Sequence, residues 1–253
     1  MTLNPEARER YSRMIKLHDM SETDMVSITK SRVAVLGAGG LGSPALRLLT
    51  SIGFGLIRIV DRDKVELSNL QRQSLYTTAD VGKSKATAAA TNLRKLNREV
   101  EFEVVREEIS HENALSLVDG VDVIVDGLDS FETRRAVNEA SVKLRIPYVF
   151  AGAVEYFANM STFVPGKTPC FACVMGEAND NPQNTAAVRG VEPCLLAMTA
   201  AVQVREASLL AMGRPPNLAG RLMTIDVSSY GFDMFEISRA WDCPVCGCLG
   251  SEE

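Results

Sequence analysis

Histidine is nearly absent from this chain of 253 residues, which has only two, His18 and His111. Histidine is the side chain that most often acts as a general base near neutral pH, so most imidazole-based mechanisms are improbable. Positive charge is not in excess either, because 27 Lys and Arg against 32 Asp and Glu give a net charge of −5. A sequence-independent nucleic-acid binder needs a basic surface, and we therefore expect no nucleic-acid partner.

Long apolar runs and an apolar leader are also missing. No apolar run reaches the ~18 residues of a membrane helix, and the first residues, MTLNPEARERYSRMIK, are charged. We expect no membrane partner, no secretory signal and a cytoplasmic protein with reduced thiols. The six cysteines all lie in the last third of the chain, so their chemistry is separate from that of the first half.

Short strands and helices alternate along the first part of the chain. Strands are expected at 32–37, 56–61, 101–105, 121–126 and 148–151, and helices at 43–52, 83–97, 112–118 and 131–144. This alternation predicts a Rossmann-like α/β fold with a doubly wound, mainly parallel sheet over residues 31–151. Residues 1–30 are expected to form a helical arm outside the core, with two short polar helices.

After residue 151 the pattern changes. Strand-like segments at 157–164 and 222–237 predict an antiparallel C-terminal extension of the sheet. A polar loop, 176–192, and an alanine-rich helix, 199–212, lie between them. No linker-like stretch separates residues 152–253 from the rest, so a single domain over 1–253 is expected.

A glycine-rich turn follows the first strand and opens the next helix. The segment 37–42, GAGGLG, matches G-x-G-x-x-G in the strand–turn–helix context that the motif requires. Its glycines let the backbone approach phosphates, and the helix N-terminus supplies N–H donors. Asp61 ends the second strand, where an acid binds ribose hydroxyls. The alternative is a tight turn without a ligand.

The charges after the second strand argue against nicotinamide chemistry. Residues 61–73, DRDKVELSNLQRQ, bring acids, an amide and a guanidinium to the nucleotide, and Lys83 and Lys85 follow. Hydride transfer needs an apolar slot, whereas converging Arg and Lys suit a triphosphate. Solvated surface charge is the alternative for any one residue, and an NAD-dependent oxidoreductase is a rival class.

Asp129 follows the fourth expected strand, at the edge where doubly wound sheets bind ligands. A carboxylate there is placed to reach phosphates through Mg²⁺, which prefers one or two carboxylates plus phosphate oxygens. The alternative is that Asp129, or equally Ser130, caps the helix 131–144.

Together these residues resemble the ThiF/MoeB/HesA family of ATP-dependent adenylating enzymes, which are similar to ubiquitin-activating enzymes. The resemblance runs from Arg10-Tyr11-Ser12-Arg13 through GAGGLG, the 61–73 string, V-G-x-x-K (81–85) and Asp129 to paired C-x-x-C elements. It implies Arg13, Arg72, Lys85 and Asp129 as catalytic residues, with Asp129 holding Mg²⁺. It implies a nucleotide-binding set of Gly37, Gly39, Gly40, Leu41, Gly42, Asp61, Asp63, Asn69, Arg72, Gln73, Lys85, Leu128, Asp129 and Ser130. Ser130 stands where many members have Asn.

The resemblance also implies a homodimer in which Arg13 reaches the partner's ATP, with the substrate, dimer and zinc contacts in residues 152–253. In the family reaction a substrate carboxylate attacks the α-phosphorus of ATP, giving an acyl-adenylate and pyrophosphate. A carboxylate with a pKa of ~4 is already ionised, so no histidine is needed. The expected substrate is the C-terminal glycine of a ubiquitin-like sulfur-carrier protein. The alternatives are a small-molecule carboxylate in cofactor biosynthesis, such as guanylylpyridinol for the [Fe]-hydrogenase cofactor, or an inactive scaffold.

Two C-x-x-C elements, Cys170–Cys173 and Cys243–Cys246, predict a structural Cys₄ zinc site in a reduced chain. A redox pair is the alternative, disfavoured because neither element is expected to open a helix after a strand. Cys248 is near enough to compete as a ligand.

The loop 176–192 lacks the cysteine that many relatives carry four residues before a Gly-Val pair; here that position is Ala186. Cys194 lies just beyond the loop, among apolar neighbours, and is expected to be a buried, inert thiol. A displaced nucleophile is the alternative for Cys194.

Overall fold

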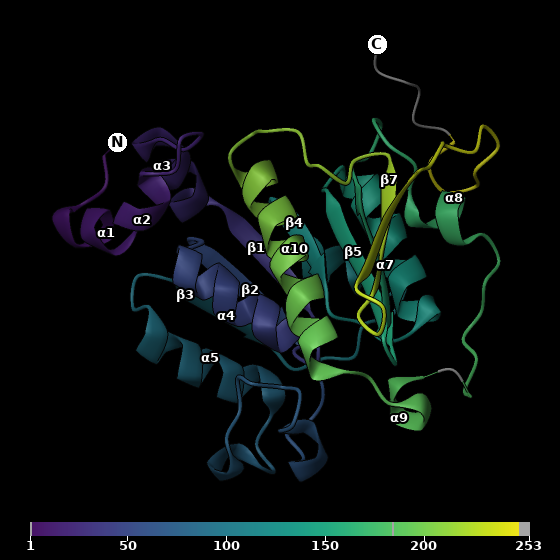
Figure 1. Cartoon of the computed structure of the whole chain (residues 1–253), viewed down its shortest axis with the longest axis horizontal. Coiled ribbons are helices and arrows are strands. Elements are labelled where there is room, and N and C mark those ends of the chain that lie inside the picture. Colours follow the sequence, from purple (N-terminus) through teal and green to yellow (C-terminus); the bar gives the residue numbers. More distant parts are fainter. Residues whose placement is uncertain (1, 184, 248–253) are drawn as a thin grey trace.

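The sheet has eight strands in the order β3-β2-β1-β4-β5-β6-β7-β8 in the computed structural model, which describes residues 2–183 and 185–247 (Figure 1). Strands β3 to β5 pair in parallel, and β5 to β8 pair antiparallel, so the Rossmann-like sheet and its antiparallel extension are confirmed. The strands are β1 (Arg32–Leu36), β2 (Leu56–Val60), β3 (Glu101–Val105), β4 (Val123–Asp126), β5 (Tyr148–Val154), β6 (Phe157–Phe163), β7 (Arg221–Asp226) and β8 (Gly231–Glu236).

Helices cover both faces of the inner strands, which is why β1 and β4 are almost continuously apolar, whereas the edge strand β3 carries two glutamates. Along β1, Val33 and Val35 pack under α4 (Gly42–Ile52), α5 (Lys85–Leu96) and α10 (Pro193–Ala211). Ala34 and Leu36 face the other way, toward α6 (Ala114–Val118) and α7 (Phe131–Leu144). This alternation places the cores on the two sides of the sheet.

The N-terminal segment forms three short helices, α1 (Pro5–Arg10), α2 (Ser12–Ile15) and α3 (Glu22–Lys30). The expectation that it lies outside the core was wrong, because Tyr11, Met25 and Ile28 are buried in the main cluster. Tyr11 fills the space beside Gly53 at the end of α4, where an added Cβ would lie 2.1 Å from the phenol oxygen. Only a residue without a side chain fits that contact.

Helix α10 begins at Pro193, six residues earlier than expected, and Glu192 caps it by accepting from the Leu195 N–H. By length and composition alone it could cross a membrane, although Gln203, Arg205 and Glu206 interrupt its apolar residues. However, α10 lies beside α4 on the same face of the sheet (Figure 1), and its Gln203 side chain is fully buried. It is therefore a core helix of this fold.

The parallel register brings the carboxyl ends of three strands together. Leu36 pairs with Val60 of β2 on one side and with Asp126 of β4 on the other. The chain leaves the sheet after these three residues at the same edge. The glycine turn, the 61–73 segment and the β4–α7 connection therefore meet there, as the sequence predicts.

Candidate functional site

The glycines of the 37–42 turn have different tasks. Gly37 has φ +91°, donates to the Val60 carbonyl at 2.8 Å, and would place a Cβ 2.4 Å from the Gly127 oxygen. A Cβ on Gly42 would lie 1.8 Å from the Gly37 oxygen, and one on Gly40 would lie 2.8 Å from Leu196 of α10. These three positions lack room for a side chain, because the turn folds tightly on itself and packs against Gly127 and against Leu196 of α10. Gly39 is the exception, because its nearest neighbour would be 3.8 Å away.

That neighbour is the amide nitrogen of Gln73, which faces the open side of the glycine turn. The Gln73 side chain is buried, and its amide oxygen has no hydrogen-bond partner within the described part of the chain. A buried amide oxygen left without a partner costs free energy, so it marks a place for a polar ligand or water. The open Gly39 and the unpaired Gln73 oxygen together fit a nucleotide.

Asp61 and Tyr76 hold the Ala38 peptide of the same turn. Asp61 accepts from the N–H groups of Ala38 and Asp63, each at 2.7 Å, and burial raises the pKa of this carboxyl despite both bonds. The Tyr76 hydroxyl donates to the Ala38 carbonyl at 2.8 Å, and burial raises its pKa too. Tyr76 was missed by the sequence reasoning, because no motif position marks it.

Lys85 and Asp63 form the charged wall of the site. Lys85 begins α5, its N–H donates to the Asp63 carbonyl at 2.8 Å, and its ammonium lies 2.9 Å from the Asp63 carboxylate. The Lys85 side chain is almost completely buried, so its charge is held in place.

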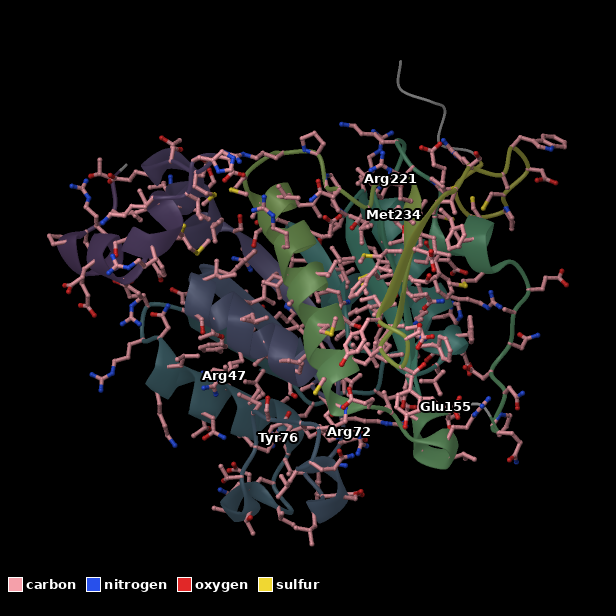
Figure 2. All side chains as sticks on the ribbon, in the orientation of Figure 1. Arg47, Arg72, Tyr76, Glu155, Arg221 and Met234 are labelled. Carbon is pink, nitrogen blue, oxygen red and sulfur yellow. The ribbon has the colours of Figure 1, made fainter. Side chains whose placement is uncertain are left out.

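Asn69 and Arg72 lie on the segment between β2 and α5. The Asn69 oxygen accepts from the Glu66 N–H at 3.1 Å, and Arg72 donates to the Ser68 carbonyl at 3.0 Å. Figure 2 shows Arg72 and Tyr76 at the end of the molecule where α10 begins, with Glu155 at the same end. Of the two predicted residues on this segment, Figure 2 thus places Arg72 at the end of the molecule where α10 begins.

The β4–α7 connection presents Asp129. Ser130 caps α7 by accepting from the Thr133 N–H at 3.1 Å, so the cap is Ser130 and not Asp129. The Asp129 side chain is exposed, and Leu128 beside it is half-buried. An exposed carboxylate at the carboxyl end of a parallel strand fits Mg²⁺ carried by a nucleotide.

A second segment, residues 176–183, is tied to the start of α7. The Asp180 carboxylate accepts from the N–H groups of Phe131 at 2.7 Å and Glu132 at 3.3 Å. Arg135 donates to the carbonyls of Gly176 and Ala178. Sequence reasoning missed Asp180 and Arg135. These residues are more than 40 positions apart in the chain, and no sequence pattern shows that the segment 176–183 contacts α7.

Arg13 follows a residue that packs at the end of α4 away from the glycine turn. It is exposed on α2, two residues after Tyr11, which packs at the C-terminal end of α4. The glycine turn lies at the other end of α4, and an eleven-residue helix is about 16 Å long at 1.5 Å per residue. The other predicted catalytic residues lie on connections that begin at the glycine-turn edge: Arg72 and Lys85 follow β2, and Asp129 follows β4.

The four predicted zinc ligands meet. The sulfur atoms of Cys170, Cys173, Cys243 and Cys246 all lie within 4.8 Å of one another, with pairs at 3.9, 3.7 and 3.5 Å. Tetrahedral zinc with bonds of ~2.3 Å requires sulfur atoms about 3.8 Å apart, so the cluster fits zinc. Asn138 donates to the Cys170 sulfur at 3.6 Å, an outer contact that orients a ligand.

Two expectations about the cysteines were wrong. Cys170 directly precedes helix α8 (Phe171–Met175), although neither C-x-x-C element was expected to open a helix. Cys194 is exposed on the first turn of α10 and not buried, and the neighbouring Glu192 raises the pKa of its thiol. A raised thiol pKa lowers the thiolate fraction, which disfavours a nucleophile. Cys248 lies outside the described residues.

These features define a nucleotide-binding α/β protein with a separate cluster of four cysteines whose geometry suits a metal ion. The family model described as ThiF family matches residues 11–245, and the chain belongs to that family. Curated relatives in this family are named sulfur carrier protein adenylyltransferases, and this chain is an adenylyltransferase.

Among curated relatives, the SAMP-activating enzyme E1 of Haloferax volcanii is 36% identical over 98% of this chain and 92% of its own length. The sulfur carrier protein adenylyltransferase of Thermus thermophilus is 35% identical over 98% and 93%. Among solved structures, Escherichia coli MccB with ATP is 25% identical, with a TM-score of 0.83 over 97% of this chain and 77% of that one.

Proposed function

We propose that this protein uses Mg²⁺ and ATP to adenylate the C-terminal glycine carboxylate of a ubiquitin-like sulfur-carrier protein. The observation that carries the proposal is the convergence of the open Gly39, the unpaired Gln73 oxygen, buried Lys85 and exposed Asp129 at one edge of the sheet. The names of the Haloferax and Thermus relatives support a protein substrate.

The residues divide the work of an in-line displacement at the α-phosphorus. Lys85, oriented by Asp63, and Arg72 would neutralise charge on the phosphates, and the turn around Gly39 would bring backbone N–H groups to them. Asp129 would hold Mg²⁺, which supplies further charge neutralisation when bound. The attacking carboxylate is already ionised at neutral pH, so the site has to align it rather than deprotonate it.

The test is ATP–pyrophosphate exchange with a panel of carboxylates that includes carrier proteins ending in Gly-Gly. Lys85→Ala and Asp129→Ala are expected to abolish exchange. Lys83→Ala is the matched control, because Lys83 is an exposed neighbour whose ammonium pairs with Asp80 at 3.2 Å. Normal exchange in both site variants would overturn the proposal. Exchange with a small-molecule carboxylate alone would keep adenylation and replace the substrate.

We also propose that the enzyme works as a homodimer in which Arg13 enters the partner's site. Its exposed position at the far end of α4 supports a role in trans. Arg13→Ala and Lys85→Ala should each be inactive alone. When equal amounts of the two variants are mixed at random, half of the dimers are heterodimers, and each of these has one intact site of two. The mixture should therefore regain about a quarter of the wild-type rate. No recovery in demonstrated heterodimers would contradict the proposal.

A further inference from the structure

A buried charged network lies directly behind the Asp129 connection. Asp126 and Tyr148 are completely buried, and Arg134 is nearly so. The Asp126 carboxylate accepts from the Arg134 guanidinium at 3.0 Å and from the Tyr148 hydroxyl at 2.5 Å. Arg134 also lies over the Phe150 ring, 5.4 Å from its centroid.

A buried charged network of this kind contributes little net free energy to the stability of a core. Removing two charges from water costs several kcal/mol each, and well-packed apolar residues often stabilise a core equally well. The contacts of the network with the backbone indicate what else it does. Arg134 donates to the Leu128 carbonyl at 2.6 Å and to the Ala151 carbonyl at 3.0 Å, while Asp126 accepts from the Leu128 N–H at 2.8 Å.

Both backbone polar groups of Leu128 are thus held by the same ion pair. The next residue is Asp129, and the preceding Gly127 donates to the Leu36 carbonyl at 2.8 Å and packs against Gly37 of the glycine turn. The network therefore fixes the connection between the nucleotide turn and the Asp129 carboxylate. The sequence reasoning assigned no role to Arg134 or Tyr148.

We propose that Arg134 is a positioning residue, which, supported by Asp126 and Tyr148, aims the Asp129 carboxylate at nucleotide-bound Mg²⁺. This inference rests on the proposed role of Asp129 in Mg²⁺–ATP binding. Arg134 touches neither ATP nor metal in this scheme. It acts only through the Leu128 peptide.

The experiment is a double-mutant cycle between Arg134→Lys and Asp129→Asn, read out as the affinity for ATP titrated with and without Mg²⁺. Lysine keeps the charge beside Asp126 but lacks the second arm that reaches the Leu128 carbonyl. Arg134→Lys is expected to weaken Mg²⁺-dependent ATP binding about tenfold, the effect of losing one hydrogen bond made by a charged group. In the Asp129→Asn background the same change should have almost no further effect.

Arg58→Lys is the matched control for a purely structural role. Arg58 pairs with Glu103 at 2.7 Å and donates to the carbonyls of Leu117 and Asp119. Like Arg134, it therefore binds one carboxylate and two backbone carbonyls, but at another place on the sheet. It should lower the melting temperature and leave the Mg²⁺-dependent affinity for ATP unchanged. Tyr148→Phe keeps the ring and removes only the bond to Asp126. It should also weaken Mg²⁺-dependent ATP binding, but less than Arg134→Lys does.

Additive effects of Arg134→Lys and Asp129→Asn would overturn the positioning role, as would an equal loss of affinity in Arg58→Lys. If Arg134→Lys fails to fold, Tyr148→Phe in both Asp129 backgrounds provides the same cycle. Failure of the wild-type protein to bind ATP would instead overturn the proposed function, so the two failures are distinguishable.

Discussion

Replacing two glycines of the same turn by alanine should have different effects. Gly42→Ala should lower the stability of the fold, whereas Gly39→Ala should weaken nucleotide binding without lowering stability. A Cβ on Gly42 would lie 1.8 Å from the Gly37 oxygen, so Gly42→Ala must push the turn and α4 apart. Forcing extra atoms into packed backbone costs about 1–3 kcal/mol and occasionally more. We expect about 3 kcal/mol here, because the obstacle is a carbonyl rather than a mobile side chain. For a chain of this size that corresponds to a fall in melting temperature of about 6–12 °C.

Gly39→Ala meets no such obstacle, since the nearest atom would be 3.8 Å from the new methyl group. Its melting temperature should stay the same or rise slightly, because alanine restricts the unfolded chain and stabilises by about 0.4–1 kcal/mol where it fits. The methyl group would occupy the open side of the turn, where we place the phosphates. Loss of one backbone contact to a charged phosphate should weaken ATP binding about 10- to 100-fold.

Thermal unfolding with and without Mg²⁺ and ATP measures both effects at once. ATP at 100 times its dissociation constant stabilises the folded state by about 2.7 kcal/mol, so the wild-type transition should move up by several degrees. At the same ATP concentration, Gly39→Ala should lose about half of that shift if binding weakens tenfold and most of it if binding weakens 100-fold, while keeping its ligand-free transition. A full ATP-induced shift in Gly39→Ala would refute the placement of the phosphates, and an unchanged transition in Gly42→Ala would refute the steric argument.

Three further predictions concern regions outside the turn. Metal analysis is expected to find one zinc ion in the wild-type protein, and Cys246→Ser should lose it and melt at a lower temperature, because structural zinc binding contributes to folding. Burial alone would raise the pKa of Asp80, but hydrogen bonds from Thr77, Asn92 and Lys83 lower it to about 2. The ionised form is thus favoured in the folded state, and its stabilisation is present above pH ~4 and is lost as the pH falls toward 2. Asp80→Asn should therefore lose about 2 kcal/mol of stability at pH 7 and show a weaker acid dependence in urea unfolding. Asp180→Ala should speed proteolytic cleavage in 176–183, whereas Glu177→Ala in the same segment should not; equal rates would contradict the tie to α7.

The sequence predicted the elements whose apolar pattern and boundaries are both clear. The strand 101–105 and the helix 131–144 have the predicted bounds, the latter because Ser130 supplies a cap before a regular apolar face. The N-terminal segment was misjudged because its few apolar residues are separated by charges. Met25 and Ile28 become core only once α3 docks on the sheet, and this contact is not visible in local periodicity.

Motifs located the candidate site better than they explained it. They named Asp61 and Asp129, which follow the carboxyl ends of β2 and β4, and Lys85, whose ammonium contacts Asp63. They did not name Tyr76 or Arg134, which hold the backbone beside those residues from elsewhere in the chain. Supporting contacts of this kind depend on strand register and helix rotation, and neither can be obtained from spacing alone.

The place of the two histidines adds an argument about the reaction itself. His111 lies at the surface, where its ring nitrogen contacts Glu139 at 3.2 Å, and His18 is exposed after α2. Neither belongs to the segments that carry Gly39, Lys85 and Asp129. Asp61, the buried carboxyl of the site, accepts one backbone N–H group on each oxygen and so holds the turn. The chemistry that fits such a site takes a nucleophile already ionised in water and supplies alignment and positive charge, as carboxylate adenylation requires.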